Sequence, residues 1–409
     1  MWNLAIKWSL RSLRSHLRQS VAVIFTLSVA YFSLLVFMGY MTDVKSKYER
    51  LYRHENMYGD LIIENPQRLS LTESPWTSMI DVPSQEILKT FLGDHSGVEE
   101  FVTFLEFEGV AGAKGPQQFV VGTGFDLKSG ARVQGVPELA PIQLAQGLAR
   151  NFGCKSLTAQ GPCSQLQFQV SVLTEAGFLN ARTMKAQALM TTPIRELNER
   201  SFRIPLGEAQ SLLQTQGLSF ISILLKPDFS ERRFRQSFEA LKHQKIVLKE
   251  LRVIPWRDHP LGELYKQSMS FLGAFQIFIL LILLIIAATT AISSTTRLLQ
   301  ERAREIGTLR AIGFSPRLVQ LQTSVELVGL SLLASGIGVL FVLLFRYLLG
   351  LAKIPYRAGL LAKPILFEIQ PIFVHFVVGA FVIGCIVGTV AWTVSRRFSL
   401  QSVQKLLTC

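Results

Sequence analysis

The sequence is poor in charge and in cysteine, and it lacks the short motifs that mark common catalytic sites. Of its 409 residues, only 17% are charged and four are cysteine. It contains no G-x-x-x-x-G-K-[ST] loop, no H-E-x-x-H pair and no G-x-S-x-G sequence, and its six histidines show no ligand spacing. These absences predict a non-catalytic chain that binds no metal, nucleotide or other cofactor of its own.

The net charge of +13 raises the question of a nucleic-acid partner. Its distribution argues against one. Residues 43–266 carry 26 Lys+Arg and 25 Asp+Glu, whereas the rest of the chain carries 16 and 4. The excess therefore flanks the hydrophobic runs, where positive charge indicates membrane orientation. We expect contact with membrane lipid and none with nucleic acid.

Long hydrophobic runs are what the sequence has in abundance. Four are long enough for a transmembrane helix, which needs about 20 mainly apolar residues. We place them at residues 20–41, 270–296, 318–349 and 372–395. The predicted fold is a membrane protein of four transmembrane helices with a large α+β extracytoplasmic domain, residues 43–266, inserted between helices 1 and 2.

Basic residues at the ends of these runs predict the orientation, since cytoplasmic flanks carry an excess of Lys and Arg. They place residues 297–317, the tail at 396–409 and both termini in the cytoplasm, and residues 43–266 outside it. Residues 1–18 combine an apolar and a basic stripe at helical spacing, which favours an amphipathic helix lying in the cytoplasmic headgroup layer. The alternative is a simple topology signal that runs into the first helix.

Residues 43–266 alternate strand and helix patterns. The predicted strands are 60–65, 117–125, 165–173 and 220–226, and the predicted helices are 84–92, 141–152, 207–216 and 231–244. The domain also holds Cys154 and Cys163, joined by a short Gly- and Pro-containing segment. An oxidising compartment would favour a disulfide between them, and the alternative is two buried or free thiols.

Small residues repeat four apart in the third and fourth runs. Gly384 and Gly388 form one pair, and Ala334 and Gly338, beside Gly336, form the other. Because small residues let membrane helices approach closely, these pairs predict helix packing within the chain or with a second copy.

Glu326 is the unusual residue of the third run, about two turns inside it. An ionisable group at such a depth is costly and faces a protein interface or water. One interpretation is a polar contact that moves during the working cycle. The other is a glutamate close enough to the surface to reach water or Arg317.

The segment between the second and third runs is charged yet helical in pattern. Leu299, Ala303 and Ile306 follow helical spacing, and no proline interrupts the pattern before Pro316, so we expect a helix of three to four turns that continues the second run. Gly313 stands where a terminating glycine is expected. Because the segment presents both charge signs, it suits a protein partner better than anionic lipid.

The string ERAREIGTLRAIGFSPRLV resembles the coupling segment of the FtsX-like permeases, the MacB-type (type VII) ABC transporter subunits. Their pattern is E-R-x-R-E-I-G-x-L-R-A-[LI]-G followed by a small residue. The matching residues are Glu301, Arg302, Arg304, Glu305, Ile306, Gly307, Leu309, Arg310, Ala311 and Gly313. Glu326 and the glycines after it continue the resemblance. Residues 197–225 are similar to a segment of the lipoprotein-releasing LolC/LolE branch, in which a helix precedes a strand, whereas the tail departs from the family and keeps only Arg396 and Arg397.

The resemblance implies a permease subunit in a bacterial inner membrane. A cytoplasmic ABC ATPase dimer, which carries the ATP and Mg, would bind the 297–317 segment, and a second permease copy or a paralogue would pair with this chain. Motion of the external domain would release or export a lipoprotein or another lipophilic envelope substrate by mechanotransmission, with a periplasmic lipoprotein, chaperone or adaptor as a further partner. The alternative is an FtsX-like regulator that activates an extracytoplasmic cell-wall hydrolase and moves no cargo. A membrane-anchored binding domain without an ATPase would not need the coupling motif.

Overall fold

A computed structural model describes residues 17–69, 76, 78–113, 117–154, 166–190, 192, 195–301, 303–313, 315–356 and 365–399. These residues form two compact units. A helical unit draws on Met1–Lys45, Ser270–Pro355 and Leu366–Cys409, and an α+β unit draws on Ser46–Met269 and Tyr356–Ile365. The predicted interfacial helix at 1–18 lies almost wholly outside the described residues, as does most of the predicted tail at 396–409.

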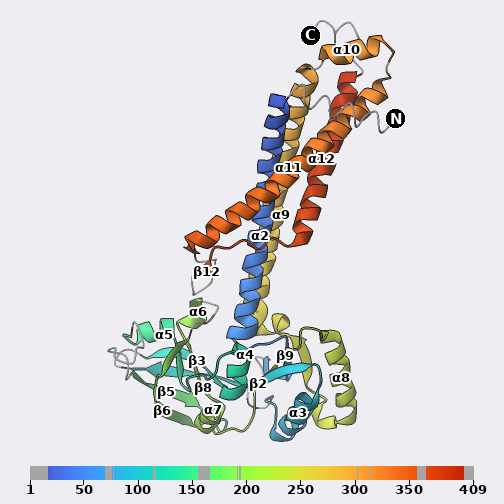
Figure 1. Ribbon diagram of the computed structural model, residues 1–409. Helices are drawn as coiled ribbons and strands as arrows, with labels where there is room; N and C mark the ends of the chain where they lie inside the picture. The colour runs from blue at the N-terminus through green and yellow to red at the C-terminus, as the bar shows by residue number, and fades with distance from the viewer. Residues whose placement is uncertain are drawn as a thin grey trace. The chain divides into compact units, whose positions relative to one another are not determined.

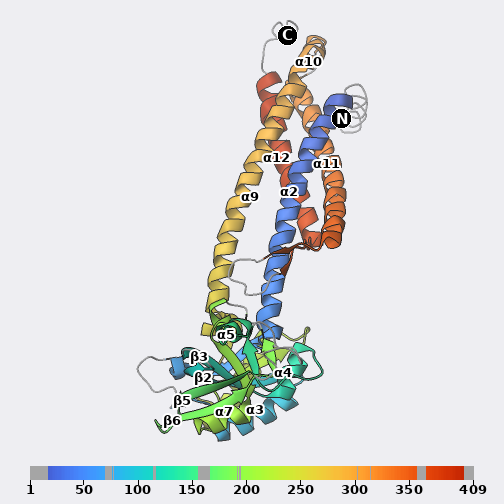
Figure 2. The same cartoon turned by 90° about the vertical axis from the view of Figure 1, so that its left-hand side faces the viewer.

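Among the described residues, four helices are long and apolar enough to cross a membrane. They are α2 (Leu17–Arg50), α9 (Pro260–Glu301), α11 (Pro316–Ala352) and α12 (Phe373–Ser399) (Figures 1 and 2). The first three contain the whole of a predicted run, and α12 begins one residue after the start of the fourth. Helices α2 and α9 continue well past the predicted ends of their runs, α2 to Arg50 and α9 back to Pro260. Each of the two is therefore one helix shared between the units.

The core of the helical unit joins α2, α11 and α12. Its largest buried side chains include Leu27, Tyr31, Leu330, Ile383 and Val387. Two hydrogen bonds connect α2 to its neighbours in this core. The Ser28 hydroxyl donates to the carbonyl of Ala334 in α11 at 3.0 Å, and the Tyr31 hydroxyl donates to the carbonyl of Phe376 in α12 at 2.6 Å. Helix α9 contributes Ala291 to this core and exposes most of its large apolar side chains within the unit.

The four glycines singled out by the sequence differ in their surroundings. A Cβ on Gly338 would lie 2.7 Å from a ring carbon of Tyr31 and 3.1 Å from the carbonyl oxygen of Ser28, so α2 and α11 touch there because position 338 has no side chain. A Cβ on Gly388 would lie 3.4 Å from Val328 of α11, which is ordinary contact, whereas Gly336 and Gly384 face open space.

Substitution of Gly338 by alanine should destabilise the helical unit, because the added methyl group overlaps a packed ring and a backbone oxygen. We expect a loss of about 1–3 kcal/mol, as is usual for overpacking. The measurement is thermal unfolding of the detergent-solubilised chain. Gly336→Ala is the matched control, two residues away on the open side of the same helix, and equal losses in both variants would contradict the close approach at 338.

The α+β unit is built on one mixed ten-stranded sheet. In spatial order its main path is β10-β1-β9-β2-β3-β8-β4-β7, and β5 pairs with β2 and β6. The strands are β1 (Leu61–Glu64), β2 (Val98–Gly112), β3 (Gln118–Phe125), β4 (Gln143–Ala145), β5 (Gln167–Leu173), β6 (Leu179–Lys185), β7 (Ala188–Met190), β8 (Ser201–Pro205), β9 (Phe220–Leu225) and β10 (Arg252–Pro255). The β3–β8 and β4–β7 pairs are parallel, and the other pairs are antiparallel. A separate two-stranded ladder pairs β11 (Pro355–Tyr356) with β12 (Ile365–Leu366).

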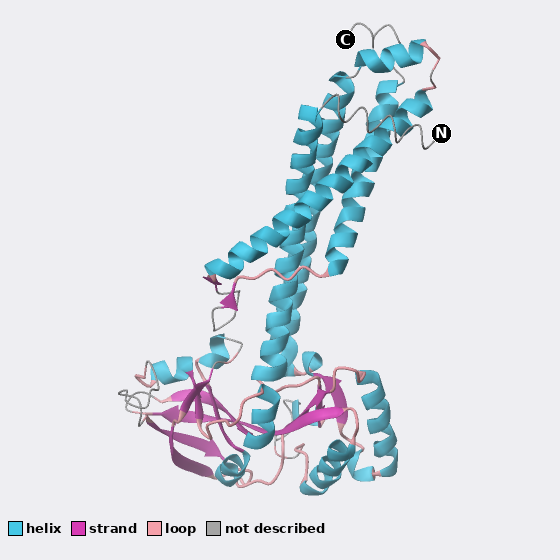
Figure 3. Ribbon diagram, viewed as in Figure 1, coloured by secondary structure: helices cyan, strands magenta, loops and turns pink. Residues whose placement is uncertain are grey.

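Helices cover both faces of this sheet (Figures 1 and 3). They are α3 (Val82–Asp94), α4 (Leu127–Gln134), α5 (Gln146–Asn151), α6 (Arg195–Asn198), α7 (Leu206–Leu213) and α8 (Glu231–Gln244). On β3, a Cβ on Gly124 would meet Ala209 of α7, whereas Phe125 points the other way, toward Gly130 of α4. One apolar core lies around α7 and the longer strands, and a second is formed by α3, α8, β1 and β9.

The sequence predictions for this unit hold for most elements, and one is wrong. The predicted strands at 60–65, 117–125, 165–173 and 220–226 are β1, β3, β5 and β9, and three of the predicted helices are α3, α7 and α8. The helix predicted at 141–152 is instead the strand β4 followed by the short helix α5. All three residues of β4 are buried between β7 and β8, a sheet environment that a short apolar run does not reveal by its periodicity.

Candidate functional site

The charged segment after α9 forms a short helix of its own. Helix α10 spans Ala303–Ala311 and lies across the ends of its neighbours rather than along α9 (Figures 1 and 3). The sequence pattern instead predicts a helix of three to four turns that continues α9 in the same direction. Leu299, Ala303 and Ile306 are buried together, and Val394 of α12 packs against them.

The two faces of α10 have opposite character. Ala303, Ile306 and Gly307 are buried, at the i, i+3 and i+4 spacing of one helical face. The opposite side exposes Arg304, Glu305 and Thr308, and at its end the apolar side chain of Ile312 is 75% exposed. Such a charged face with one apolar residue is suited to a protein contact.

The turn after α10 depends on its glycine. Gly313 has a φ of +102°, a conformation open to glycine and strained for other residues, and α11 then begins at Pro316. Before α10, Glu301 accepts from Arg297, four residues earlier in the sequence, at 3.2 Å. Arg302 lies outside the described residues, and the side chains of Leu309 and Arg310 are likewise not described.

Glu326 is buried in α11, whereas Arg317 is exposed at the start of the same helix. Gln320, Thr323 and Glu326 are all buried and follow one another at three-residue spacing, so they share a face of α11. The burial disfavours a glutamate that reaches the surface, and the moving polar contact stays a prediction.

A second group of contacts lies where α2 ends and α9 begins, inside the α+β unit. One carboxylate oxygen of Glu49 accepts hydrogen bonds from Arg257 at 3.0 Å and from the Tyr265 hydroxyl at 3.1 Å. Tyr52 stacks on Trp256 with ring centroids 5.0 Å apart, and Tyr265 packs against both rings. These contacts fasten the last turns of α2 to the first turns of α9.

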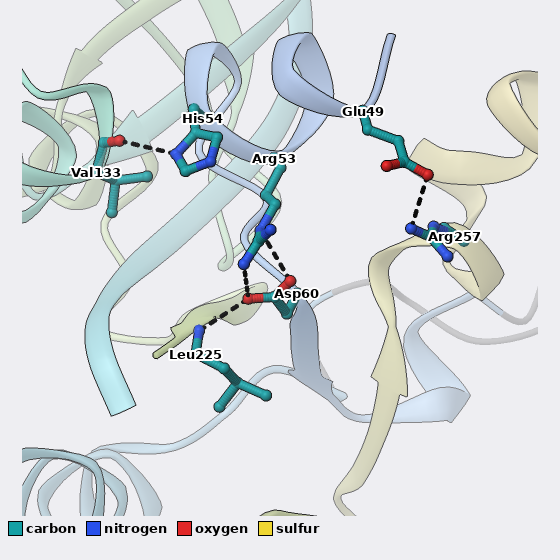
Figure 4. Close-up of polar contacts among 7 residues, drawn as sticks. All are labelled: Glu49, Arg53, His54, Asp60, Val133, Leu225 and Arg257. Carbon is teal, nitrogen blue, oxygen red and sulfur yellow. Dashed lines mark hydrogen bonds and ion pairs between the residues drawn. The ribbon is translucent and has the colours of Figure 1, made fainter. Parts of the chain in front are cut away.

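The end of α2 is also fastened to the sheet (Figure 4). The carboxylate of Asp60 accepts from the guanidinium of Arg53 at 2.8 and 2.9 Å and from the backbone N–H of Leu225 at 2.8 Å, so it links the helix end to β9. On the other side, His54 Nδ1 lies 3.4 Å from the carbonyl oxygen of Val133 in α4.

The carbonyl groups of the five-residue π-helix that ends α2, Leu51–Glu55, are all hydrogen-bonded. Backbone N–H groups of the following turn serve the first four. The carbonyl of Glu55 accepts from the side chains of Gln134 at 2.8 Å and Arg203 at 3.4 Å. Arg203 also donates to Asn56 Oδ1 at 2.9 Å, and burial lowers the pKa of its guanidinium below the ordinary value.

The first turn of α9 rests on a buried ionic cluster. Glu64, at the end of β1, is fully buried, and one of its carboxylate oxygens accepts from Arg252 at 2.9 and 2.6 Å. Its other oxygen lies 3.1 Å from Nε2 of His259, which is 2% exposed. Burial alone would raise the pKa of Glu64, but His259 and Arg252 outweigh it, and the pKa lies below its usual value of 4.5.

A cleft of about 1070 Å³ lies beside the end of α2 in the α+β unit. Both basic and acidic side chains line it, among them Arg50, Arg132, Glu99 and Glu138.

Cys154, in another part of the unit, is buried and disulfide-bonded. Cys163, its expected partner, lies outside the described residues, so this pairing stays a prediction.

Sequence reasoning found α10 through its motif and missed the contacts at the bases of α2 and α9. Trp256 and Tyr265 pack on Tyr52, a contact between residues far apart in the sequence. The one sequence signal for the cluster around Glu64 is that this glutamate ends the apolar run DLIIEN. A strand pattern does not show which distant residues its side chains will contact.

One family model matches the part of the chain that contains α10. Residues 277–402, just under a third of the chain, match the family model described as FtsX-like permease C-terminal. These residues are therefore similar to the C-terminal region of FtsX-like permeases. A search of curated proteins gave no match.

Two solved structures resemble the chain distantly. The periplasmic region of MacB from Actinobacillus actinomycetemcomitans is 12% identical, with a TM-score of 0.35, and the likeness covers 55% of this chain and 98% of that one. The extracellular domain of YknZ, a noncanonic ABC-type transporter from Gram-positive bacteria, is 11% identical, with a TM-score of 0.32, 48% of this chain and 98% of that chain being covered. Likenesses this distant carry no argument about function.

Asp60→Ala should destabilise the α+β unit, because it leaves Arg53 and the N–H of Leu225 without their shared acceptor. The expected loss is about 1–3 kcal/mol. Denaturant unfolding of the full chain in detergent measures it. Asp258→Ala removes the partner of Lys266 in a pair whose side chains are 51% and 58% exposed, and should cost less than about 1 kcal/mol. If both variants cost the same, the Asp60 contacts do not stabilise the end of α2.

Acid should destabilise the same unit through Glu64. Because the folded-state pKa of Glu64 is lowered, its contribution to stability is fully present above the unfolded-state pKa near 4.5 and is lost as the pH falls through the folded value. The melting temperature of the wild type should therefore fall steeply below about pH 4.5. Glu64→Gln should melt lower at pH 7 and show a weaker acid dependence, and parallel pH curves for the two proteins would contradict this assignment.

Proposed function

We propose that the chain is the permease subunit of an MacB-type (type VII) ABC transporter, whose ATPase is a separate cytoplasmic protein that holds ATP and Mg. The observation that carries this proposal is α10. Its motif follows the family's coupling pattern, its apolar face is buried on α9 and α12, and its charged face with Ile312 is exposed. A helix of this kind offers an ATPase dimer a contact surface that is already held in place.

The proposed mechanism is mechanotransmission. Helices α2 and α9 each continue without interruption from the helical unit into the α+β unit. A continuous helix carries displacement along its length far better than a jointed segment. At their ends in the α+β unit both helices are held by ion pairs and stacked rings, so the motion driven from α10 would reach the sheet.

The orientation follows the distribution of basic residues. Both termini and α10 lie in the cytoplasm of a bacterium, and residues 43–266 lie outside the inner membrane. A second permease copy or a paralogue completes the complex, and the α9 surface, poorly covered within one chain, is suited to face it or lipid.

The proposed cargo is a lipoprotein or another lipophilic component of the envelope. Support comes from residues 197–225, similar to the LolC/LolE branch, which form the helix α7 followed by the strand β9, the order of elements in that branch. The α+β unit is also larger than a regulator of a cell-wall hydrolase would need. Activation of such a hydrolase, without transport of cargo, is the alternative function.

Glu305→Lys should abolish stimulation of the partner ATPase by this permease. Glu305 is exposed on α10, so its reversal changes the contact face and leaves the buried face intact. The measurement compares ATP hydrolysis by the reconstituted complex, with expression and membrane insertion checked separately. Asp228→Lys, an equal charge reversal at an exposed residue of the α+β unit, should leave the rate unchanged. Unaltered stimulation by Glu305→Lys would remove the docking role of α10.

Mass spectrometry of the complex purified from native membranes tests the wider proposal. An ABC ATPase with bound lipoproteins or a periplasmic adaptor would support the transporter. An ATPase accompanied by a cell-wall hydrolase alone would support the regulator, and the lack of any ATPase under conditions that preserve such complexes would contradict both.

A further inference from the structure

The cluster of Glu64, Arg252 and His259 joins three parts of the chain at one point. Glu64 and Arg252 stand directly opposite each other in the antiparallel pair of β1 and β10, and Glu64 faces Phe220 of β9 on its other side. The ring of His259 packs 5.3 Å from that of Phe220. One carboxylate thus touches a neighbouring strand and the residue that directly precedes α9.

His259 connects this cluster to the helix. Its Nδ1 accepts the backbone N–H of Leu261 at 3.2 Å, which satisfies one of the amide groups that every helix leaves unpaired in its first turn. Its Nε2 faces Glu64. The imidazole therefore binds the first turn of α9 through Nδ1, and its Nε2 lies 3.1 Å from Glu64 of the sheet.

Close backbone packing holds the same turn from the other side. A Cβ on Gly262 would lie 2.2 Å from the carbonyl oxygen of Trp256, so only glycine lets the first turn of α9 sit against the preceding turn. The N–H of Gly262 donates to the carbonyl of His259 at 2.7 Å. The first turn of α9 therefore packs directly on the backbone of Trp256 and Arg257, which follow β10.

An ionic cluster is a poor way to gain stability here and a good way to fix geometry. Taking charges out of water is costly, and apolar residues of similar volume often stabilise a protein as well or better. Directed hydrogen bonds, in contrast, set an angle as well as a distance. Arg252 keeps 43% of its side chain exposed, which limits the cost of the cluster.

We propose that Glu64, Arg252 and His259 are positioning residues that lock the first turn of α9 to the β1–β10 edge of the sheet, so that displacement of α9 moves the sheet as one body. This role adds to the proposed function, and the claim that α9 moves the sheet rests on that function. The cluster carries no chemistry and needs no ligand. Its hydrogen bonds fix the orientation of the first turn of α9, which an apolar contact would not do.

The test uses the full chain in complex with its ATPase. An apolar triple variant, Glu64→Leu with Arg252→Met and His259→Leu, removes every charge together and leaves none buried without a partner. Hydrogen exchange reports the first turn of α9, and thermal unfolding reports stability. Spin labels on Lys128→Cys in the two permease chains, in a background with Cys385→Ser and Cys409→Ser, report ATP-dependent motion of the α+β units.

The proposal expects the triple variant to melt close to the wild type, because burial of apolar side chains replaces the ionic contacts. Amide exchange at residues 261–264 should speed up about tenfold, as expected for loss of a hydrogen-bonded anchor. ATP hydrolysis should continue while the ATP-dependent distance change is lost. A variant that keeps the full distance change, or that exchanges as slowly as the wild type, would overturn the lock.

A second variant keeps the test decisive if the triple variant fails to fold. Gly262→Ala leaves Glu64, Arg252 and His259 in place but forces the first turn of α9 away from Trp256. It should give the same faster exchange and the same loss of motion, and unchanged motion together with faster exchange would overturn the lock. Asp258→Asn, in the exposed pair with Lys266, is the control and should match the wild type.

The two proposals fail in different ways. If the wild-type complex shows no ATP-dependent distance change, mechanotransmission fails and the transmitting role of the cluster falls with it, while exchange at residues 261–264 still decides whether the cluster anchors the helix. If the wild type moves and both variants move equally, the proposed function stands and the lock is rejected.

Discussion

A helix that ends inside a folded domain leaves its last carbonyl groups without helical partners, and each must be satisfied there. The end of α2 meets this constraint in full. The carbonyls of Leu51–Glu55 accept from the turn that follows and from Gln134 and Arg203. The side chain of Arg53 binds Asp60, which in turn binds β9, and Glu49 binds Arg257 and Tyr265 at the start of α9. These hydrogen-bonding partners come from several elements of the sheet domain, so movement of the end of α2 would also move those elements. The polar contacts therefore make the end of α2 part of the domain.

The two units use opposite means of fixing a helix. In the α+β unit, polar groups do so through Asp60, Glu49 and the Glu64 cluster. In the helical unit, contact is mainly apolar, and its closest approach depends on the missing side chain of Gly338 against Tyr31 and Ser28. This division matches the physics of the two environments, since close packing of small residues favours helix association where the hydrophobic drive between helices is absent.

Elements with a strong local pattern were predicted well from the sequence. The four apolar runs, the helix at 231–244 and the strand at 220–226 are all present, because each has a period that shows its own type. The long strand β2 was not anticipated, and the helix predicted at 141–152 was wrong. Both segments owe their form to several neighbours: β2 pairs with β3, β5 and β9, and β4 lies between β7 and β8.

The sequence by itself determined the class of the chain, its four apolar helices and the motif of α10, because periodicity, run length and a contiguous charged string are local properties. Tertiary structure decided which face of α10 is covered, since Ile306 is buried near Val394 of α12. It also decided the contacts at the helix bases. Glu64 meets Arg252 across 188 positions of sequence, and Glu49 meets Arg257 across 208. Contacts between such distant residues exist only once the sheet has brought β1 beside β10 and has set the start of α9 against the end of α2.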